Sequence, residues 1–524
     1  MSITDLPLEL LTRICEHVEP QEWGALRITC RQIYDHTLEA YATRYFKRVT
    51  LLLTREGLDR LEHVASSEIF RRSVEEIWII PNLFDHWAGL DKADFTKVNN
   101  MKWVLRLGRP PTVEEKNEDQ AALEALFAVF EATMVEHRAI LESPGLLGRL
   151  EKCLPRLENA ITLGLRRYDT RFLLNTARNT DFTCLGLQAL KSHFNFKIVP
   201  MHIQTLSHIP YSLVFSQLLN AVIKSSRKVK SLHTCGHNFC GMALESFQLP
   251  ESQDQSLLPL LKDLTTLHIC IRLRDHEQEN LDENTFNRLL NIMFTASPTL
   301  KTLHFAQWSP IEELSPLYFK NVSRRIQFTQ LEELHLHSIE VTVNSLEEFL
   351  RKAAPTLKRL SLRLVSLVDG IASAPDLGPL TQNTSSWVTS MSTEAKNEIQ
   401  GLWKRVFEFW ADHLSLQYVE LSVLGYRGRS ITLHDNFYME RGQQGAESCP
   451  GVNPASFYFD AEKANIPFNE WVTQLQIEIV HQPSSGGPKL PGTSKIHLRD
   501  PRQDFSGQFT IACNPSLMSR TSIG

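Results

Sequence analysis

The chain lacks the features that define several large classes of protein. No apolar run reaches the roughly 20 residues of a membrane-spanning helix. Residues Met1–Asp5 show neither a basic region nor an apolar stretch, so we expect no secretory signal. A formal net charge of −5 over 524 residues gives no basic excess for nucleic acid, and no polybasic run suggests a membrane surface. We therefore expect neither nucleic acid nor a membrane as a partner.

Cysteine is sparse and unpaired in its spacing. The nine cysteines are an odd number, scattered from Cys15 to Cys513. A disulfide framework would show an even number at regular spacings, whereas scattered cysteines are typical of reduced thiols. The expected location is the cytoplasm, the nucleus or both.

Catalytic motifs are also missing. The sequence contains no Gly-x-Ser-x-Gly elbow, His-Glu-x-x-His helix, phosphate-binding loop or kinase signature, so we expect neither an enzyme nor a cofactor. Cys235-Gly-His237-Asn-Phe-Cys240 is similar to the middle of a RING finger, but the flanking cysteine pairs are absent. Zinc would need a fourth ligand such as His233. We prefer a loop here and predict no metal site.

The first fifty residues predict three short helices. Pro7 suits a first helical turn, where Glu9 meets the positive end of the helix dipole. Glu19-Pro20 ends this helix, a second is expected from Gln21 to about Thr29, and a third from about Arg31. Apolar residues recur at helical spacing in the first helix, namely Leu10, Leu11, Ile14 and Val18. Helices with so little apolar mass cannot bury a full core alone, so we expect them to pack on a partner or on the rest of the chain.

The residues of this segment resemble a known motif. Leu6-Pro7-x-Glu9-Leu10, then Ile14, then Trp23-x-x-Leu26-Arg27-x-x-Cys30-Arg31 is similar to the F-box, although Trp23 replaces a more usual smaller apolar residue. The resemblance implies docking on the Skp-type adaptor of a cullin–RING (SCF) ubiquitin ligase. The residues it implies for the adaptor interface or its support are Leu6, Pro7, Leu10, Ile14, Trp23, Leu26 and Cys30. The alternative is an ordinary N-terminal helical hairpin.

A strand pattern, apolar-x-x-apolar-x-apolar, recurs through the rest of the chain. From Val229 its starts lie 35, 36, 31 and 26 residues apart. Amphipathic helices follow, as at Glu283–Phe294 and Asn344–Leu350, and each leads through a Pro-containing turn into the next strand. These units resemble irregular leucine-rich repeats of the helix-containing kind, which must stack to bury their apolar faces. The copies are Val74–Ile79, Phe182–Leu187, Leu264–Ile269, Leu300–Phe305, Leu331–Leu336, Leu357–Leu362, Leu416–Leu421 and Val472–Ile477.

The expected fold is α/β, a three-helix F-box followed by a degenerate repeat solenoid with parallel strands and outer helices. A generic α/β domain is the alternative, but no glycine-rich nucleotide-binding turn supports it. We divide the chain into an F-box domain (1–48), an irregular repeat array (49–370) with a helical arm near 112–142, a Ser/Thr-rich linker or loop (371–394), terminal repeats or a cap (395–482) and a disordered tail (483–524). An F-box followed by irregular repeats resembles a class of F-box proteins common in fungi.

The repeat register places histidines at equivalent strand positions. The residue between the last two apolar positions of each repeat strand is expected on the open face, and parallel strands lie roughly 4.8 Å apart. The pattern therefore predicts a column on a target-binding face; its members are His233, His268, His304 and His335, followed by Ser361 and Glu420. Clustered imidazoles resist joint protonation, so such a face could sense pH. A coincidence of register is the alternative.

Together these observations predict a non-catalytic substrate receptor that joins an unknown protein target to the adaptor and, through it, to a cullin–RING ligase. Two other classes remain open. One is a scaffold that binds the adaptor or other proteins without directing ubiquitination. The other is an enzyme with a site assembled from distant residues, which would show a deep polar pocket with perturbed titratable groups.

Overall fold

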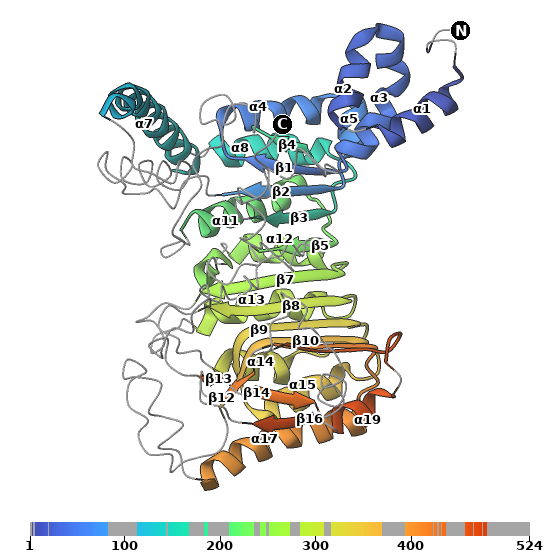
Figure 1. The fold of residues 1–524 in the computed structure, drawn as a ribbon, viewed down its shortest axis with the longest axis vertical. Helices are drawn as coiled ribbons and strands as arrows, with labels where there is room; N and C mark the ends of the chain where they lie inside the picture. Colours follow the sequence, from blue (N-terminus) through green and yellow to red (C-terminus); the bar gives the residue numbers. More distant parts are fainter. Residues whose placement is uncertain are drawn as a thin grey trace. The chain divides into compact units, whose positions relative to one another are not determined.

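Strands and helices alternate along most of the described chain (Figure 1). The computed structural model divides into two units, Met1–Cys235 with Phe239–Leu267, and Gly236–Asn238 with His268–Gly524. The residues it describes are 3, 6–18, 20–81, 113–142, 145–166, 183–186, 209–234, 241–247, 251–272, 283–308, 316–368, 393–422, 424–426, 429–430, 432–435, 456–464, 466–473 and 475–478.

The first unit begins with three short helices and continues into a parallel sheet. The helices are α1 (Leu8–His17), α2 (Pro20–Thr29) and α3 (Arg31–Tyr45). The strands are β1 (Arg48–Leu52), β2 (Glu76–Ile80), β3 (Thr162–Leu165), β4 (Thr183–Leu185) and β5 (Ser231–His233), and they pair in parallel in the order β4-β1-β2-β3-β5. The other helices and short elements of this unit are α4 (Arg55–Ser66), α5 (Glu68–Ser73), α7 (Val113–Glu142), α8 (Gly145–Cys153), η3 (Leu154–Arg156), α11 (Ile209–Ser225), β6 (Met242–Ala243), η4 (Leu244–Phe247) and α12 (Glu251–Leu261).

Strand β4 departs from the predicted order. The sequence pattern places a repeat strand at this point of the chain, between β3 and β5, but β4 pairs with β1 at the edge of the sheet. Two glycines permit this position. Gly186 has φ +87°, in the left-handed region, and an added Cβ would lie 3.0 Å from Cα of Gly57. A Cβ on Gly57 would lie 2.3 Å from the carbonyl oxygen of Leu52. The close approach of the two backbones at Gly57 and Gly186 lets β4 pair beside β1. The spacing of apolar residues carries no information about such an approach.

The second unit repeats strand and helix with longer strands. Strands β7 (Thr266–Arg272), β8 (Thr302–Trp308), β9 (Glu333–Val341), β10 (Arg359–Leu367) and β11 (Tyr418–Ser422) lie side by side in this order, with β8 to β11 parallel. The intervening helices are α13 (Glu283–Ala296), α14 (Pro316–Arg325), α15 (Val343–Ala353) and α17 (Thr393–His413). The predicted strand–helix alternation is therefore present in a mixed α/β fold.

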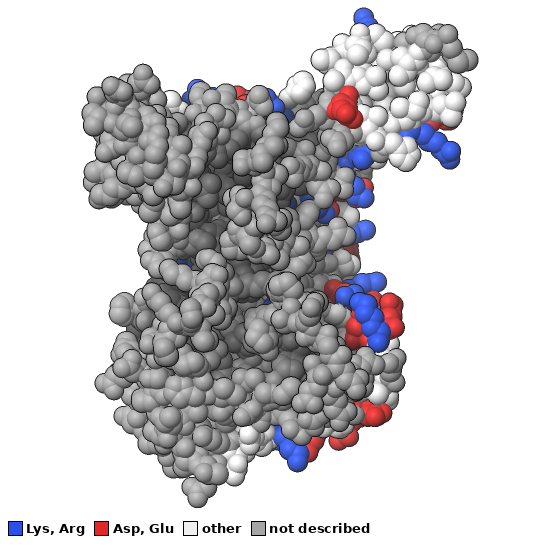
Figure 2. Space-filling model, viewed as in Figure 1, with Lys and Arg blue, Asp and Glu red and all other residues white. Residues whose placement is uncertain are grey.

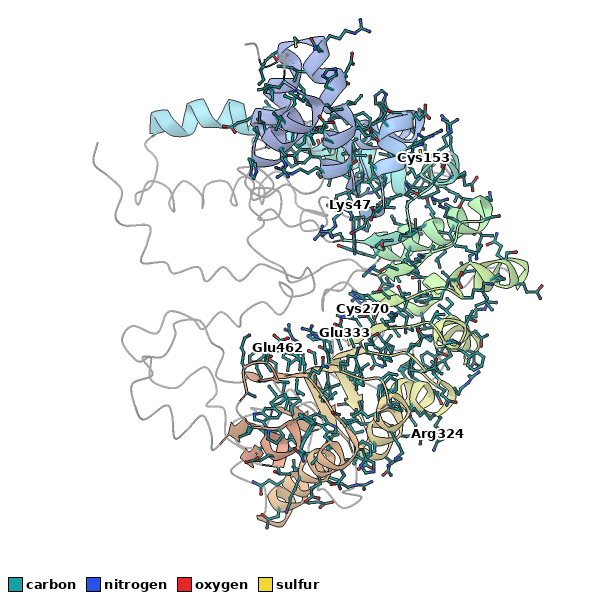
Figure 3. The ribbon with its side chains drawn as sticks, turned by 90° about the vertical axis from the view of Figure 1, so that its right-hand side faces the viewer. Lys47, Cys153, Cys270, Arg324, Glu333 and Glu462 are labelled. Atoms are coloured by element: carbon teal, nitrogen blue, oxygen red, sulfur yellow. The ribbon has the colours of Figure 1, made fainter. Side chains whose placement is uncertain are left out.

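Each strand of the second unit sends its leucines toward the helices and its polar residues to the opposite face. On β9, Leu334 and Leu336 are fully buried, whereas Glu333 and His335 are half-buried. Figure 3 shows the result: Cys270 and Glu333 lie on the strand side, and Arg324 lies on the helix side. Burial of the leucine face drives the helices onto the sheet, and the strand face remains as the surface on which polar side chains line up.

The last predicted repeat differs from the others. Strand β16 (Leu475–Glu478) pairs antiparallel with β14 (Thr432–Asp435), next to the short helix α19 (Phe468–Thr473). Strand β15 (Ser456–Asp460) pairs antiparallel with β11, and β13 (Arg429–Ser430) pairs antiparallel with β12 (Gly425–Tyr426), which itself adds to β10. The parallel pattern therefore stops after β11 and β12.

Several predicted segments lie outside the described residues. They are most of the linker at 371–394, of which only Thr393 and Glu394 are described, in α17; the tail at 483–524; and the run Cys235–Cys240. The predicted helical arm near 112–142 is a helix, α7.

Charged side chains are mixed in sign on the described surface. Lys47 lies 3.3 Å from Glu75, and Lys358 lies 2.8 Å from Glu332. Figure 2 shows blue and red side chains close together along the right-hand edge of the described surface. The charged side chains on that edge thus form no patch of one sign.

Candidate functional site

Helices α1 to α3 pack around a small aromatic core. Trp23 of α2 is 1% exposed, and its ring meets Tyr41 and Tyr45 of α3 edge-on, with centroids 5.7 and 5.5 Å apart. Cys15 of α1 is fully buried in the same cluster. Burial raises the pKa of the Cys15 thiol against a smaller, opposing effect of Arg27, so the thiol remains neutral and apolar. Trp23 therefore joins the three helices.

Arginines cover the rim of this core. The guanidinium of Arg27, itself only 7% exposed, lies 4.0 Å from the ring centroid of Tyr41 and 4.4 Å from that of Tyr34. Arg44 lies 5.8 Å from the Trp23 ring and donates a hydrogen bond to the Cys15 carbonyl oxygen at 3.4 Å. Guanidinium groups over aromatic faces shield the rings from water, and the ring faces in turn attract the positive charge.

The helix ends also follow from the sequence. Pro7 is the N-cap of α1, and α2 begins at Pro20, where the missing N–H of proline costs no hydrogen bond. Cys30 is the N-cap of α3, and its Sγ accepts a hydrogen bond from the Ile33 N–H at 3.5 Å. The predicted breaks at residues 19–20 and near residue 30 are confirmed.

One side of α1 carries apolar side chains that the chain itself does not cover. Leu10 and Ile14, one turn apart, are 50% and 40% exposed, and Leu8 is 48% exposed. Leu11 and Cys15, on the neighbouring face of the same helix, are buried. On α2, Ile28 is 84% exposed. A small helical module that builds a core with one face and leaves such residues in water has an apolar surface suited to a partner protein.

Comparison with known families assigns this module. Residues 3–38 match the family model of the F-box domain. This segment is an F-box domain. The F-box implies binding to the adaptor of an SCF-type ubiquitin ligase, and F-box proteins are generally non-catalytic adaptors. No curated protein matches the sequence.

The seven residues predicted for the adaptor interface or its support fall into two groups. Leu10, Ile14 and Pro7 are exposed on or before α1, whereas Trp23 is core. Leu6, Leu26 and Cys30 are half-buried. The structure thus assigns Trp23 a supporting position and Leu10 and Ile14 a surface position.

Sequence reasoning missed two exposed apolar residues of the F-box, Leu8 and Ile28. Leu8 stands at the first position of α1, and Ile28 stands near the end of α2. Ile28 is out of phase with Trp23, a buried apolar residue of its helix, and that spacing was the available signal. Leu8 precedes the buried Leu11 and Cys15 by three and seven residues, so helical spacing gave no signal of its exposure.

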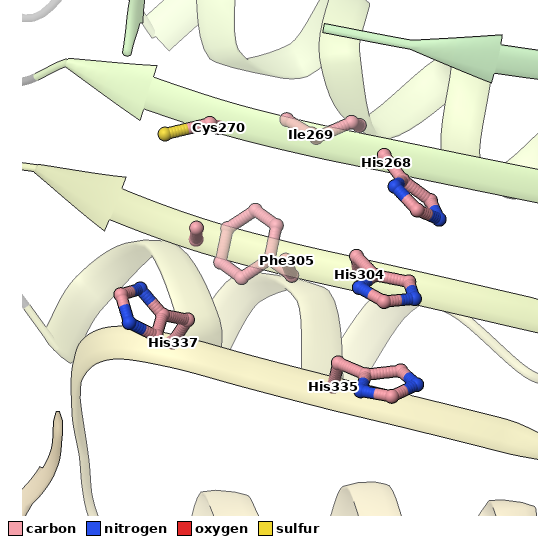
Figure 4. A pocket seen from close by; sticks show the side chains of 8 residues that line it. His268, Ile269, Cys270, His304, Phe305, His335 and His337 are labelled. Carbon is pink, nitrogen blue, oxygen red and sulfur yellow. The ribbon is translucent and has the colours of Figure 1, made fainter. Parts of the chain in front are cut away.

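In the second unit, three predicted histidines form a column. The ring centroids of His268 and His304 are 3.7 Å apart, and those of His304 and His335 are also 3.7 Å apart with an interplanar angle of 11° (Figure 4). Strand register causes this, because His304 of β8 is the direct partner of His335 of β9. The predicted alignment is present for these three residues, and their role in target binding stays a prediction.

The other two predicted face residues are buried. His233 of β5 is 9% exposed, and its ring is tilted by 50° against that of Trp78 of β2, with centroids 4.7 Å apart. Gly164 lies beside both rings, and its missing side chain leaves room for them. Glu420 of β11 is 6% exposed, accepts a hydrogen bond from Ser361 at 3.0 Å and pairs with Arg363. The strand pattern predicts a solvent-facing position for both residues. Instead, Trp78 covers His233, and Arg363 and Ser361 cover Glu420.

Two kinds of feature are missing from the part of the chain that the structure describes. It holds no group of three or more His, Cys, Asp or Glu side chains placed to bind a metal ion. Among its helices, none combines the length and the apolar character needed to cross a bilayer.

Two buried histidines predict a loss of stability in mild acid. Burial lowers the pKa of His233 to about 4 and that of His337 to about 3. Below pH 6.5 the unfolded chain binds a proton at each of these histidines, whereas the folded chain does not until the pH reaches the lowered pKa. The free energy of unfolding is therefore highest above pH 6.5 and falls as the pH drops toward these values. Between pH 6.5 and pH 5, before ordinary carboxylates take up protons, each histidine should remove about 2 kcal/mol from its unit.

Denaturant unfolding at pH 7, 6 and 5 measures this loss. His337→Gln should flatten the pH dependence of the second unit. His233→Gln should reduce that of the first unit, where burial also lowers the pKa of His137. His413→Gln, at an exposed position of α17, is the matched control and should change nothing. An unfolding free energy equal at pH 7 and pH 5 would contradict the prediction.

Proposed function

We propose that this F-box protein is the substrate-recognition subunit of an SCF-type, cullin–RING ubiquitin ligase. The observation that carries the proposal is the exposed apolar surface of α1 within the matched F-box, made of Leu10 and Ile14 on one side and Leu8 at the start of the helix. A Skp-type adaptor would cover these side chains and remove them from water. At about 25 cal/mol per Å² of apolar area, burying three large aliphatic side chains stabilises a complex by several kcal/mol.

The rest of the chain would hold the target protein. In this proposal the strands and helices after residue 49 form an irregular leucine-rich-repeat solenoid, and the target binds on its strand face, in the cytoplasm or the nucleus. The chain contributes proximity: a target held beside a charged ubiquitin-conjugating enzyme reacts as if within one molecule. Its own residues would take part in no covalent step.

A pull-down with a purified Skp-type adaptor tests the docking step. Leu10→Asp/Ile14→Asp should abolish capture, because both positions are exposed and the folded chain tolerates the change while the apolar contact is lost. Val135→Asp makes the same kind of change at a 68% exposed position of α7, outside the F-box, and should leave capture intact.

Equal capture of the wild type and the Leu10/Ile14 variant would place the adaptor elsewhere. Failure of the folded wild type to bind any Skp-type adaptor would refute the receptor proposal. If the adaptor binds, ubiquitination of co-purified proteins in a reconstituted ligase separates a receptor from a scaffold, since a scaffold would support no transfer.

A further inference from the structure

The stacked histidines of the second unit stand on a face whose fixed charges cancel. We call His268, His304 and His335 the histidine stack. Glu333, next to it on β9, lies 3.4 Å from Arg359 and 4.0 Å from His335. The interaction with His335 is the largest cause that holds the pKa of Glu333 below its ordinary value; burial opposes it, and the charge of Arg359 adds to it. This carboxylate is therefore already occupied.

Two further carboxylates of the same face are matched in the same way. Arg363 pairs with Glu420, and Lys463 lies 2.8 Å from Asp460. The titratable and charged groups on this face of β7 to β11 and β15 are Cys270, Arg272, Glu333, His337, Glu340, Arg359, Arg363, Tyr418, Glu420, Tyr458 and Asp460, besides the stack itself. Among them, four carboxylates stand with four cations, counting Lys463. A proton taken up by the stack is thus a net positive charge.

A cavity beside the stack is too small to be the binding site itself. It is lined by His304, His335 and His337 with Cys270 and Ala306, among others, and has a volume of about 10 Å³, the room of about one water molecule (Figure 4). A metal is disfavoured too, since parallel rings direct their in-plane lone pairs side by side instead of toward one point, and the described residues offer no metal-binding group. Recognition must therefore occur at the exposed edges of the rings.

Because the rings are stacked, the charge of the histidine stack depends on the neighbouring rings and on any anion at the ring edges. An imidazole ordinarily takes up its second proton near pH 6.5. Two positively charged rings 3.7 Å apart would repel each other. An anion at the ring edges offsets this repulsion and gains charge-assisted hydrogen bonds in return. Lower pH and anion binding then favour each other.

We propose that the histidine stack is a docking site for an anionic side chain, carboxylate or phosphate, of an acidic peptide segment, and that binding strengthens as the pH falls below about 7. The inference deepens the receptor proposal, and rests on it for identifying the segment as part of a ubiquitination target. Binding itself is measured on the chain alone. Its failure would leave adaptor capture untouched, and failed capture would leave the docking site standing.

Fluorescence anisotropy with the full chain and three labelled peptides tests the site. The peptides are hexaglutamate, a serine peptide carrying phosphoserines, and hexaglutamine. The acidic peptides should bind about three- to tenfold more tightly at pH 6.2 than at pH 7.6, as expected for one added ion pair with hydrogen bonds. Tighter binding of hexaglutamate identifies carboxylate as the preferred anion, and tighter binding of the phosphopeptide identifies phosphate; either supports the site.

His304→Gln, in the middle of the stack, should remove the pH dependence and weaken acidic-peptide binding to the level of hexaglutamine. His413→Gln, at an exposed histidine of α17, should behave as the wild type. If His304→Gln does not fold, His335→Gln, at a side chain 29% exposed, replaces it. Affinity that is equal at both pH values, equal for hexaglutamine, or unchanged by the stack variants would overturn the proposal.

Discussion

Trp23→Ala is expected to unfold the F-box helices and abolish adaptor capture. The Trp23 ring meets the rings of Tyr41 and Tyr45 edge-on, with centroid distances of 5.7 and 5.5 Å, and packs with Cys15 of the first helix. Its removal therefore leaves a cavity at the centre of this core. Replacing a buried tryptophan with alanine costs about 3–5 kcal/mol. A three-helix module with few other buried residues has little stability beyond that amount.

Limited proteolysis of residues 6–46 and the adaptor pull-down measure the two effects. Trp23→Phe is the control: it keeps an aromatic ring, and the indole N–H that it removes has no hydrogen-bond partner among the described residues. It should cost far less and retain capture. A protease-resistant Trp23→Ala variant that still captures the adaptor would show that α1 to α3 are held by contacts other than this core.

Arg363→Met should destabilise the second unit by about 3–5 kcal/mol. Arg363 and Glu420 are 13% and 8% exposed, so the methionine variant leaves a carboxylate buried without its cation. The cost arises mainly from that stranded charge and much less from the lost attraction. Arg363 also lies next to His337 across β9 and β10, and contributes to the low pKa of that histidine.

The double variant Arg363→Met/Glu420→Gln separates these causes in a denaturant titration. Glutamine keeps an acceptor for the Ser361 hydroxyl and carries no charge, so most of the lost stability should return. Lys358→Met removes one partner of an exposed pair at the start of the same strand and should cost less than about 1 kcal/mol. A single variant as stable as the wild type, or a double variant no better than the single, would contradict the argument.

Much of the fold was predictable because it depends on local periodicity. Spacing of apolar residues placed α1 to α3, strands β7 to β11 and helices α13 and α15 close to their observed bounds. The edge position of β4 and the antiparallel pairing of β16 were not predicted. Both depend on which strand edge is free and on how closely two backbones approach at Gly57 and Gly186, and neither property appears in a pattern of apolar residues.

The candidate sites divide in the same way. The F-box was found from a run of Leu, Pro and Arg positions, and the family match confirms it. The solvent exposure of these residues could not be predicted from the sequence. Leu10 and Trp23 are both apolar, yet Leu10 is 50% exposed and Trp23 is 1% exposed. Along the strands, the repeat register predicted the alignment of His268, His304 and His335 that the structure shows. The same register predicted a solvent-facing position for Glu420, which is buried.

The sequence by itself determined that this protein begins with an F-box and continues in alternating strands and helices, because both follow from the order and spacing of side chains along one chain. Only the tertiary structure decided which of these side chains meet water. Burial and pairing depend on neighbours distant in sequence: Arg363 lies 57 residues before Glu420, and its guanidinium makes that glutamate part of the interior. In the histidine stack, the side chain of His335 is 29% exposed, although the strand pattern treats it in the same way as Glu420.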